Sequence, residues 1–254
     1  EEIFATMERS LQVMKESVQD GLDKDKRSAS GLTGGDAYKL NEALKAGKNI
    51  AGHFFGNAMM KAVAVAQTNA CMGRIVASPT AGSCGILPSA LLTLQEEKNI
   101  SDKDLVMALF TASAVGIVIA TNASVAGAAG GCQAECGAAS AMAAAAMVEL
   151  CGGTPKQCEH ACAIALKNIL GLVCDPVAGL VEIPCIKRNA GGVGNALVAA
   201  ELALAGVESH IPADEVIVAM KKIGDTMSST LKETAEGGLA VTPTGKKLCE
   251  KVFG

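Results

Sequence analysis

The chain is poor in aromatic residues and in histidine. It has no Trp, one Tyr, five Phe and three His among 254 residues, yet half of its residues are hydrophobic. Small and aliphatic side chains therefore carry the hydrophobic share, and we expect a core built mainly from them. With so few histidines, residue type alone does not identify a general base for a catalytic site.

The charge pattern has no excess of either sign that would indicate a partner. A net charge of −4 with no basic stripe provides no electrostatic argument for nucleic-acid binding. The opening segment EEIFATMERS lacks the basic start and apolar run of a secretory signal peptide. We therefore expect a cytoplasmic protein whose ten cysteines are thiols or metal ligands, and not a disulfide framework.

One long stretch carries no charge at all. It runs from Leu105 to Gly131, over 27 positions, and exceeds the length of about 18 residues that makes a membrane-span candidate. Because it is rich in Ala, Gly, Ser and Thr and lacks aromatic belts, we predict a buried central helix, broken near Thr121-Asn122. A small-residue membrane span is the alternative, which fractionation without detergent would test.

Apolar residues recur at helical spacing along most of the chain, and strand signals are weak throughout. One apolar face predicts a first helix; it is made by Ile3, Phe4, Met7, Leu11, Met14 and Val18. Polar, glycine-rich loops are predicted at 21–36 and 78–85, with helical segments at 37–46 and 50–71 between them. Further helix starts are indicated at Ser101, Thr154-Pro155 and Pro212. The pattern predicts an all-α fold, a single multi-helix catalytic domain over 1–254 with about nine or ten helices.

Three cysteines lie in segments marked by glycine, proline or asparagine, where a ligand set would be displayed. They are Cys132 in GGCQAECG, Cys174 in LVCDPVAG and Cys185 in EIPCIKRNAGG. Thiolates are soft ligands that favour iron-sulfur clusters, zinc and copper(I). Three of them, with one coordination position left over, would suit a catalytic cluster.

Four segments resemble a known family. They are MGRIVASPTAGSCGILPSALL, AGGCQAECGAASAMAAAAMVELCGGTP, GLVCDPVAGLVEIPCIKRNAGG and TAEGGLAVTPTG. They are similar to the α chain of the iron-sulfur-dependent L-serine dehydratases, and the likeness runs from about Gly31 to Gly245. The resemblance implies a helical fold with a [4Fe-4S] cluster on Cys132, Cys174 and Cys185. It also implies a separate β chain, for which this chain has no room, and hence a hetero-oligomer.

The chemistry that this resemblance implies is the elimination of water from L-serine. With three irons held by cysteine, the fourth iron is open and acts as a Lewis acid on the substrate hydroxyl. A base removes the α-proton, and the resulting aminoacrylate tautomerises and hydrolyses to pyruvate and ammonia. No pyridoxal phosphate is needed, and no lysine here lies in the serine-lysine loop that pyridoxal enzymes show.

The SPTAGSCG loop is the candidate substrate site under this resemblance. Its hydroxyls and backbone N–H groups precede a helix predicted to start near Ile86, which would suit a carboxylate. The substrate-binding candidates are Ser78, Thr80, Gly82 and Ser83. The alternative is an ordinary turn that joins two helices.

Two catalytic candidates lie outside this loop. Lys39, in GGDAYKL, could pair with the substrate carboxylate or act as a base, or it could be an ordinary solvated lysine. Asn189 could orient the substrate or a cluster sulfur, while its neighbour Arg188 could equally be a surface charge. A packed core role is expected of His53, so we place the general base on the β chain as a hypothesis.

The remaining cysteines have plainer interpretations. Cys136 follows Cys132 by one helical turn and is expected beside the site or in the core, and Cys249 is left out of the ligand set. Cys158 and Cys162 have the spacing of a two-point metal clip, but core packing is the expected role. The same role is expected of Cys71, Cys84 and Cys151.

Two other functions would use the same residues. A structural zinc protein would close the site with a fourth ligand from Cys136 or His160. A related cluster enzyme would act on cysteine or threonine. Some threonine turnover is compatible with a serine enzyme, because one extra methyl group on the substrate changes discrimination by only about 1–3 kcal/mol.

Overall fold

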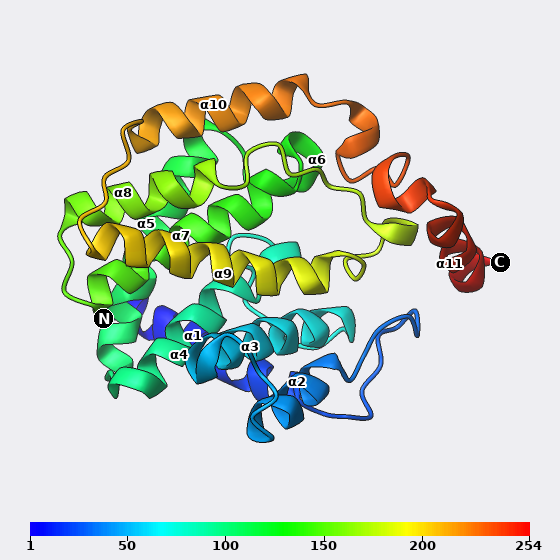
Figure 1. Ribbon diagram of the computed structural model, residues 1–254, viewed down its shortest axis with the longest axis horizontal. Coiled ribbons are helices and arrows are strands. Elements are labelled where there is room, and N and C mark those ends of the chain that lie inside the picture. The colour runs from blue at the N-terminus through cyan, green and yellow to red at the C-terminus, as the bar shows by residue number, and fades with distance from the viewer.

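Helices make up all the regular structure of the chain. The computed structural model describes residues 1–254 and contains eleven α-helices and no β-sheet (Figure 1). The α-helices are α1 Glu2–Gly21, α2 Asp36–Lys45, α3 Gly52–Ala70, α4 Ile86–Lys98, α5 Asp102–Asn122, α6 Gly127–Gly130, α7 Ala138–Leu150, α8 Pro155–Lys167, α9 Cys185–Leu204, α10 Ala213–Thr226 and α11 Pro243–Phe253. The shorter turns are the 3₁₀ turns η1 Ala81–Ser83, η3 Val177–Gly179, η4 Ser229–Leu231 and η5 Gly238–Val241 and the π-helical turn η2 Gln133–Gly137. The all-α prediction is confirmed, with slightly more helices than predicted.

Side-chain caps begin several helices where the sequence predicts them. The Ser101 hydroxyl accepts a hydrogen bond from the Asp104 N–H at 3.2 Å, at the start of α5. At the start of α8, Thr154 and Gln157 cap each other's backbone N–H groups, and Pro155 occupies the first helical position. Each cap satisfies backbone donors that the helix itself leaves unpaired. Pro212 lies one residue before α10, also as predicted.

The enclosed central helix of the fold is α7. Every residue from Ala138 to Val148 is buried, and α7 packs against α4, α5, α8 and α9 (Figure 1). Its side chains are mostly alanine, so neighbouring helices can approach it on all sides without leaving gaps. The prediction of a buried small-residue central helix is confirmed, although the helix is not the one that the uncharged run indicates.

The uncharged run from Leu105 to Gly131 is not enclosed, and that placement was wrong. Helix α5 does end at Asn122, where a break is predicted, but Met107, Ile117 and Val118 are 48%, 65% and 43% exposed. Helix α5 packs on α7, α1 and α10, and the face that carries these three residues is left exposed. A run without charged residues can be buried at little cost, but its sequence does not say on which faces other helices will pack. By length and composition, α5 is the one helix that meets the test for a membrane span, with 39% of its most apolar window buried.

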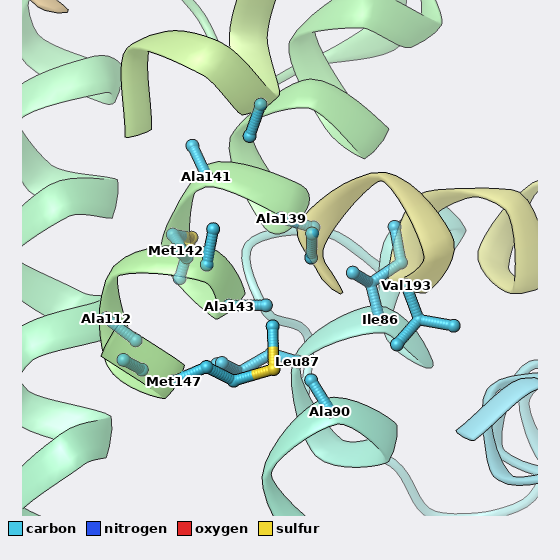
Figure 2. Packing of buried hydrophobic residues seen from close by; sticks show 14 of the residues in the cluster. Ile86, Leu87, Ala90, Ala112, Ala139, Ala141, Met142, Ala143, Met147 and Val193 are labelled. Atoms are coloured by element: carbon cyan, nitrogen blue, oxygen red, sulfur yellow. The ribbon is translucent and has the colours of Figure 1, made fainter. Parts of the chain in front are cut away.

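The core joins helices that are distant in the sequence. A single cluster of 51 buried hydrophobic residues draws on helices from α1 to α10. Figure 2 shows Ile86 of α4 and Val193 of α9 beside Ala139 of α7. Gly192 allows this approach, because a Cβ atom there would collide with the Ile86 side chain. Helices α4, α7 and α9 are thereby held close together, and their N-terminal ends carry the candidate site residues.

Candidate active site

Cys132 lies at the entrance of the π-helical turn that leads into α7. Gly131, just before it, has φ of 77°, a left-handed conformation that favours glycine, and a Cβ atom there would lie 2.7 Å from the Met227 sulfur. The buried Gln133 side chain then bonds the backbone of three segments, at Gly130, Met220 and Gly171. π turns interrupt a helix at a cost and are frequent at functional sites. Here the turn is fixed on several sides and holds Cys132 in the interior.

Arg188 joins the segments that carry Cys174 and Cys185. Its guanidinium donates to the Val173 carbonyl at 2.8 Å and to Asp175 Oδ1 at 2.9 Å. Asp175 Oδ2 accepts from the Leu239 N–H at 2.8 Å, and so connects the η5 segment as well. The Arg188 side chain is only 18% exposed. It is therefore a partly buried cation paired within the protein, and the alternative of a surface charge was wrong.

Asn189 connects the candidate substrate loop to the helix of Cys185. It is almost fully buried, accepts from the Gly85 N–H at 2.8 Å, and donates to the Gly82 and Cys185 carbonyls at 2.8 and 2.9 Å. All of its polar atoms are thus engaged within the protein. This geometry makes Asn189 a positioning residue that sets the distance between the loop and Cys185. It also occupies the Gly85 N–H, so this donor is not free for a ligand.

The predicted substrate loop contains one hydroxyl with no partner. Ser78 is 5% exposed, and its Oγ makes no hydrogen bond in the structure. An unpaired buried hydroxyl costs about 1–3 kcal/mol, so its presence requires an explanation. Thr80 donates to Glu135 Oε1 at 2.7 Å and lies 3.2 Å from the Ser83 hydroxyl. The loop thus holds one unused donor, Ser78, and contacts the buried Glu135 carboxylate through Thr80.

Glu135 is the functional candidate that sequence reasoning missed. It is 9% exposed, and its Oε2 lies 4.0 Å from the Cys174 sulfur while Oε1 contacts Thr80. Two glycines leave room for this carboxylate: a Cβ atom at Gly82 would lie 3.0 Å from Oε1, and one at Gly127 2.8 Å from Oε2. A signal was present, since Glu135 is the only charged residue between Asp104 and Glu149.

The thiols of Cys132, Cys174 and Cys185 share one environment. Contact with the Cys136 thiol, 3.4 Å away, lowers the pKa of Cys132 against the opposing effect of burial, and the Arg188 charge assists. Burial raises the pKa of Cys185 to about 12, with a further contribution from Cys132. Burial and the Glu135 carboxylate also raise the pKa of Cys174 well above its usual range. Burial raises the pKa of Glu135 too. Four acidic groups therefore compete for the same small volume, and a cation placed among them would relieve their repulsion.

These thiols suit a polynuclear cluster better than a single ion. No three His, Cys, Asp or Glu side chains form a group tight enough to enclose one metal ion. In a cluster each thiolate binds a different metal atom, so the sulfurs lie further apart. Cys132, Cys174 and Cys185 come from three segments, and their thiol charges act on one another. This set of soft thiolate donors fits an iron-sulfur cluster.

The other candidates lie apart from the thiols. The Lys39 side chain is 75% exposed, and its ammonium bonds Asp36 at 3.1 Å. His53 is exposed at the start of α3, so its predicted core packing was wrong. His53 lies in the first turn of α3, where no other helix packs over it. Cys249 is half-buried on α11. The structure thus brings together the cysteines and the substrate loop, but not Lys39.

Fold and site together define a class of protein: an all-α protein that gathers buried thiols and one buried carboxylate where the loops before its central helices meet. Residues 1–240 match the family described as the serine dehydratase alpha chain. The chain belongs to this family.

Similar proteins occur in several bacteria. The chain is 56% identical over 254 residues to the probable L-serine dehydratase alpha chain of Bacillus subtilis (strain 168), covering all of this chain and 84% of that one. It is 47% identical over 248 residues to the L-serine dehydratase alpha chain of Peptoniphilus asaccharolyticus, covering 98% and 85%. It is 37% identical over 251 residues to the L-serine dehydratase TdcG of Escherichia coli (strain K12), covering 94% of this chain and 54% of that protein.

Proposed function

We propose that this chain is the catalytic α chain of an L-serine dehydratase, which converts L-serine to pyruvate and ammonia. Family membership and the names of its relatives support the reaction. The convergence of Cys132, Cys174 and Cys185 beside a loop with an unused hydroxyl supports the location of the site. The abundance of free thiols supports the cytoplasm as its compartment.

A [4Fe-4S] cluster on these three cysteines would supply an open iron that polarises the substrate hydroxyl. This chain's own residues do the rest of the binding. Ser78 offers its unpaired hydroxyl to the substrate carboxylate, and Thr80 and Ser83 flank it. Glu135 faces the same space, where its negative charge suits the substrate ammonium. Carboxylate, ammonium and hydroxyl are then held at three separate places.

Asn189 and Arg188 position these groups without touching the substrate. Asn189 fixes the loop against Cys185, and Arg188 fixes the Cys174 segment against α9. None of the three histidines lies among the residues of the site described above, and Lys39 is paired with Asp36 at the surface. Our hypothesis is that the α-proton acceptor belongs to a separate β chain. The alpha-chain relatives support such a partner by name. Full turnover by the purified α chain alone would overturn this assignment.

The test is an anaerobic absorption spectrum and an iron assay on the full chain, followed by a pyruvate assay with L-serine and the β chain. We expect visible absorption, roughly four irons per chain and pyruvate release. Single replacements of Cys132, Cys174 or Cys185 by Ser should each remove the chromophore. Cys71→Ser is the matched control and should retain it, because Cys71 is a half-buried thiol after α3. A chain that binds only zinc after reconstitution with iron and sulfide, and releases no pyruvate, would instead be a structural metal protein.

A further inference from the structure

Two of the ten cysteine thiols are in direct contact. The Cys132 and Cys136 sulfurs lie 3.4 Å apart, and both side chains are almost fully buried. All ten cysteines of the chain are free thiols. The S–S bond of a disulfide is about 2.0 Å long. The pair therefore needs only a small approach of its sulfurs to form a bond.

A second pair with the same spacing does not share this contact. Cys158 and Cys162 are also four residues apart, but they lie in the regular α-helix α8, and no hydrogen bond joins their thiols. Cys136 instead lies inside the π-helical turn that Cys132 precedes. Sequence spacing is thus equal at the two pairs, and only the local backbone differs. Cys158 and Cys162 therefore serve as an internal control for the effect of the π-helical turn.

We propose that Cys132 and Cys136 are a modification site, a dithiol that a hydroperoxide oxidises to an intramolecular disulfide whenever no metal holds Cys132. The Cys132 sulfur attacks the peroxide, the O–O bond breaks, and Cys132 becomes a sulfenic acid as an alcohol or water leaves. The Cys136 sulfur then displaces the hydroxyl as water, and the S–S bond forms. Two thiols lose two electrons and two protons in total, and the peroxide takes up both.

The disulfide has a consequence for the proposed cluster. It removes Cys132 from the ligand set and leaves only Cys174 and Cys185, so the site cannot be reloaded until a reductant opens the bond. It also stops oxidation at a reversible stage, since a sulfenic acid without a neighbouring thiol proceeds to irreversible acids. This consequence rests on the proposed function, whereas formation of the disulfide does not.

The experiment treats the full chain, stripped of metal by a chelator under anaerobic conditions, with equimolar hydrogen peroxide. Remaining thiols are then blocked with N-ethylmaleimide, and the chain is cut after glutamate. Glu135 lies between Cys132 and Cys136, and Glu159 lies between Cys158 and Cys162, so each pair falls on two fragments. We expect linked fragments at Cys132–Cys136, released by reductant, and separate fragments at Cys158–Cys162. Blocked or sulfinylated thiols at Cys132 and Cys136, or a link from Cys132 to Cys174 or Cys185, would overturn the proposal.

Two further samples separate this proposal from the proposed function. Cys136→Ser should abolish the link and leave Cys132 as a sulfenic acid at the same peroxide dose, and a second equivalent of peroxide should take it to the sulfinic acid. Chain loaded with iron and sulfide should link less, because Cys132 is bound. If the stripped chain links but takes up no iron, the dithiol stands and the cluster assignment fails. If it takes up iron but never links, the dithiol proposal alone fails.

Discussion

At the scale of single residues, the site depends on two glycines, which have no side chain. Gly82 and Gly127 approach the Glu135 carboxylate from two directions, and a Cβ atom at Gly127 would also lie 3.0 Å from the Cys174 sulfur. Such distances are too short for ordinary packing, so either side chain would displace the carboxylate or the thiol. The two glycines therefore let the Glu135 carboxylate lie between the substrate loop and Cys174.

Gly127→Ala should reduce cluster content and serine turnover strongly while the chain still folds. The added methyl group displaces Glu135 and Cys174, but it lies at the site and not in the main core. Iron content and the melting curve are the measurements. Gly191→Ala is the matched control: Gly191 lies in α9 with open space around it, so this change should keep the cluster and stabilise the chain by about 0.5–1 kcal/mol. Equal iron content in both variants would contradict the close approach at Gly127.

Glu135→Gln tests the assignment of this carboxylate to the substrate ammonium. The amide has nearly the same shape and can still accept the Thr80 hydrogen bond, but it carries no charge. A hydrogen bond to a charged group contributes about 1.5–3 kcal/mol, so KM for L-serine should rise about 10- to 100-fold. We expect a smaller change in kcat, measured with the β chain present. A fall in kcat at constant KM would instead place Glu135 in the chemical step.

At the scale of elements, an ion pair between a buried lysine and an exposed carboxylate joins α3 to α4. Lys61 is 4% exposed, and its ammonium bonds Glu96 at 2.5 Å. The Glu96 carboxylate is 59% exposed and also accepts from Asn57 at 2.8 Å. Burial lowers the pKa of Lys61, and the carboxylate only partly compensates. The desolvation cost of the ion pair therefore arises mainly at the buried lysine.

Lys61→Met should leave stability unchanged or raise it by about 1–4 kcal/mol near neutral pH, because it removes a buried charge and keeps the apolar volume. Glu96→Ala should do the opposite and cost about 1–3 kcal/mol, since the buried ammonium loses its acceptor. Urea unfolding of both variants provides the comparison. Loss of stability in Lys61→Met as large as in Glu96→Ala would show that the pair itself is stabilising.

The same pair predicts a pH dependence with a definite sign. The folded-state pKa of Lys61 lies below its ordinary value of 10.5, so between the two values the unfolded chain binds more protons. The free energy of unfolding of the native chain therefore rises with pH in that window, relative to Lys61→Met. The advantage of the Met variant should shrink toward about pH 10. A constant difference across the window would contradict a lowered pKa.

At the scale of the whole molecule, the C-terminal helix is set apart from the core. Figure 1 shows α11 at one edge of the protein, and it packs against η3 and η5. Gly245 is its only buried residue. Because η3 directly follows the Cys174 segment, α11 covers one side of the candidate site without belonging to the main core.

Removal of residues 243–254 should change the melting temperature by less than about 4 °C, because little apolar surface becomes exposed. Amide exchange in residues 174–180 should become faster, because η3 loses its cover. Leu109→Ala is the control for a change in the core, where a 2% exposed leucine of α5 costs about 2–5 kcal/mol. A loss of stability on truncation equal to that of Leu109→Ala would make α11 part of the cooperative core.

Local features of the sequence were predictable because their causes lie within a few residues. The first helix follows from the spacing of apolar residues, and the caps at Ser101 and Thr154 follow from hydroxyls that satisfy neighbouring N–H groups. The segments around Cys132, Cys174 and Cys185 could be selected as ligand segments because glycine, proline or asparagine lies close to each cysteine in the sequence. The distance of Lys39 from these segments could not be predicted from nearby residues. The structure shows that Lys39 pairs with Asp36 at the surface.

The sequence by itself thus determined the helical class, several helix starts and the cysteines of the site. Tertiary structure alone decided which helix is enclosed: the uncharged part of α7, 138–148, is covered on all sides, whereas the uncharged part of α5, 105–122, has one exposed face. It also decided that Thr80, Glu135 and Cys174 meet, and that Arg188 and Asn189 connect their segments. These contacts join residues dozens of positions apart. They arise from helix packing, which depends on all the core side chains together and not on any local pattern.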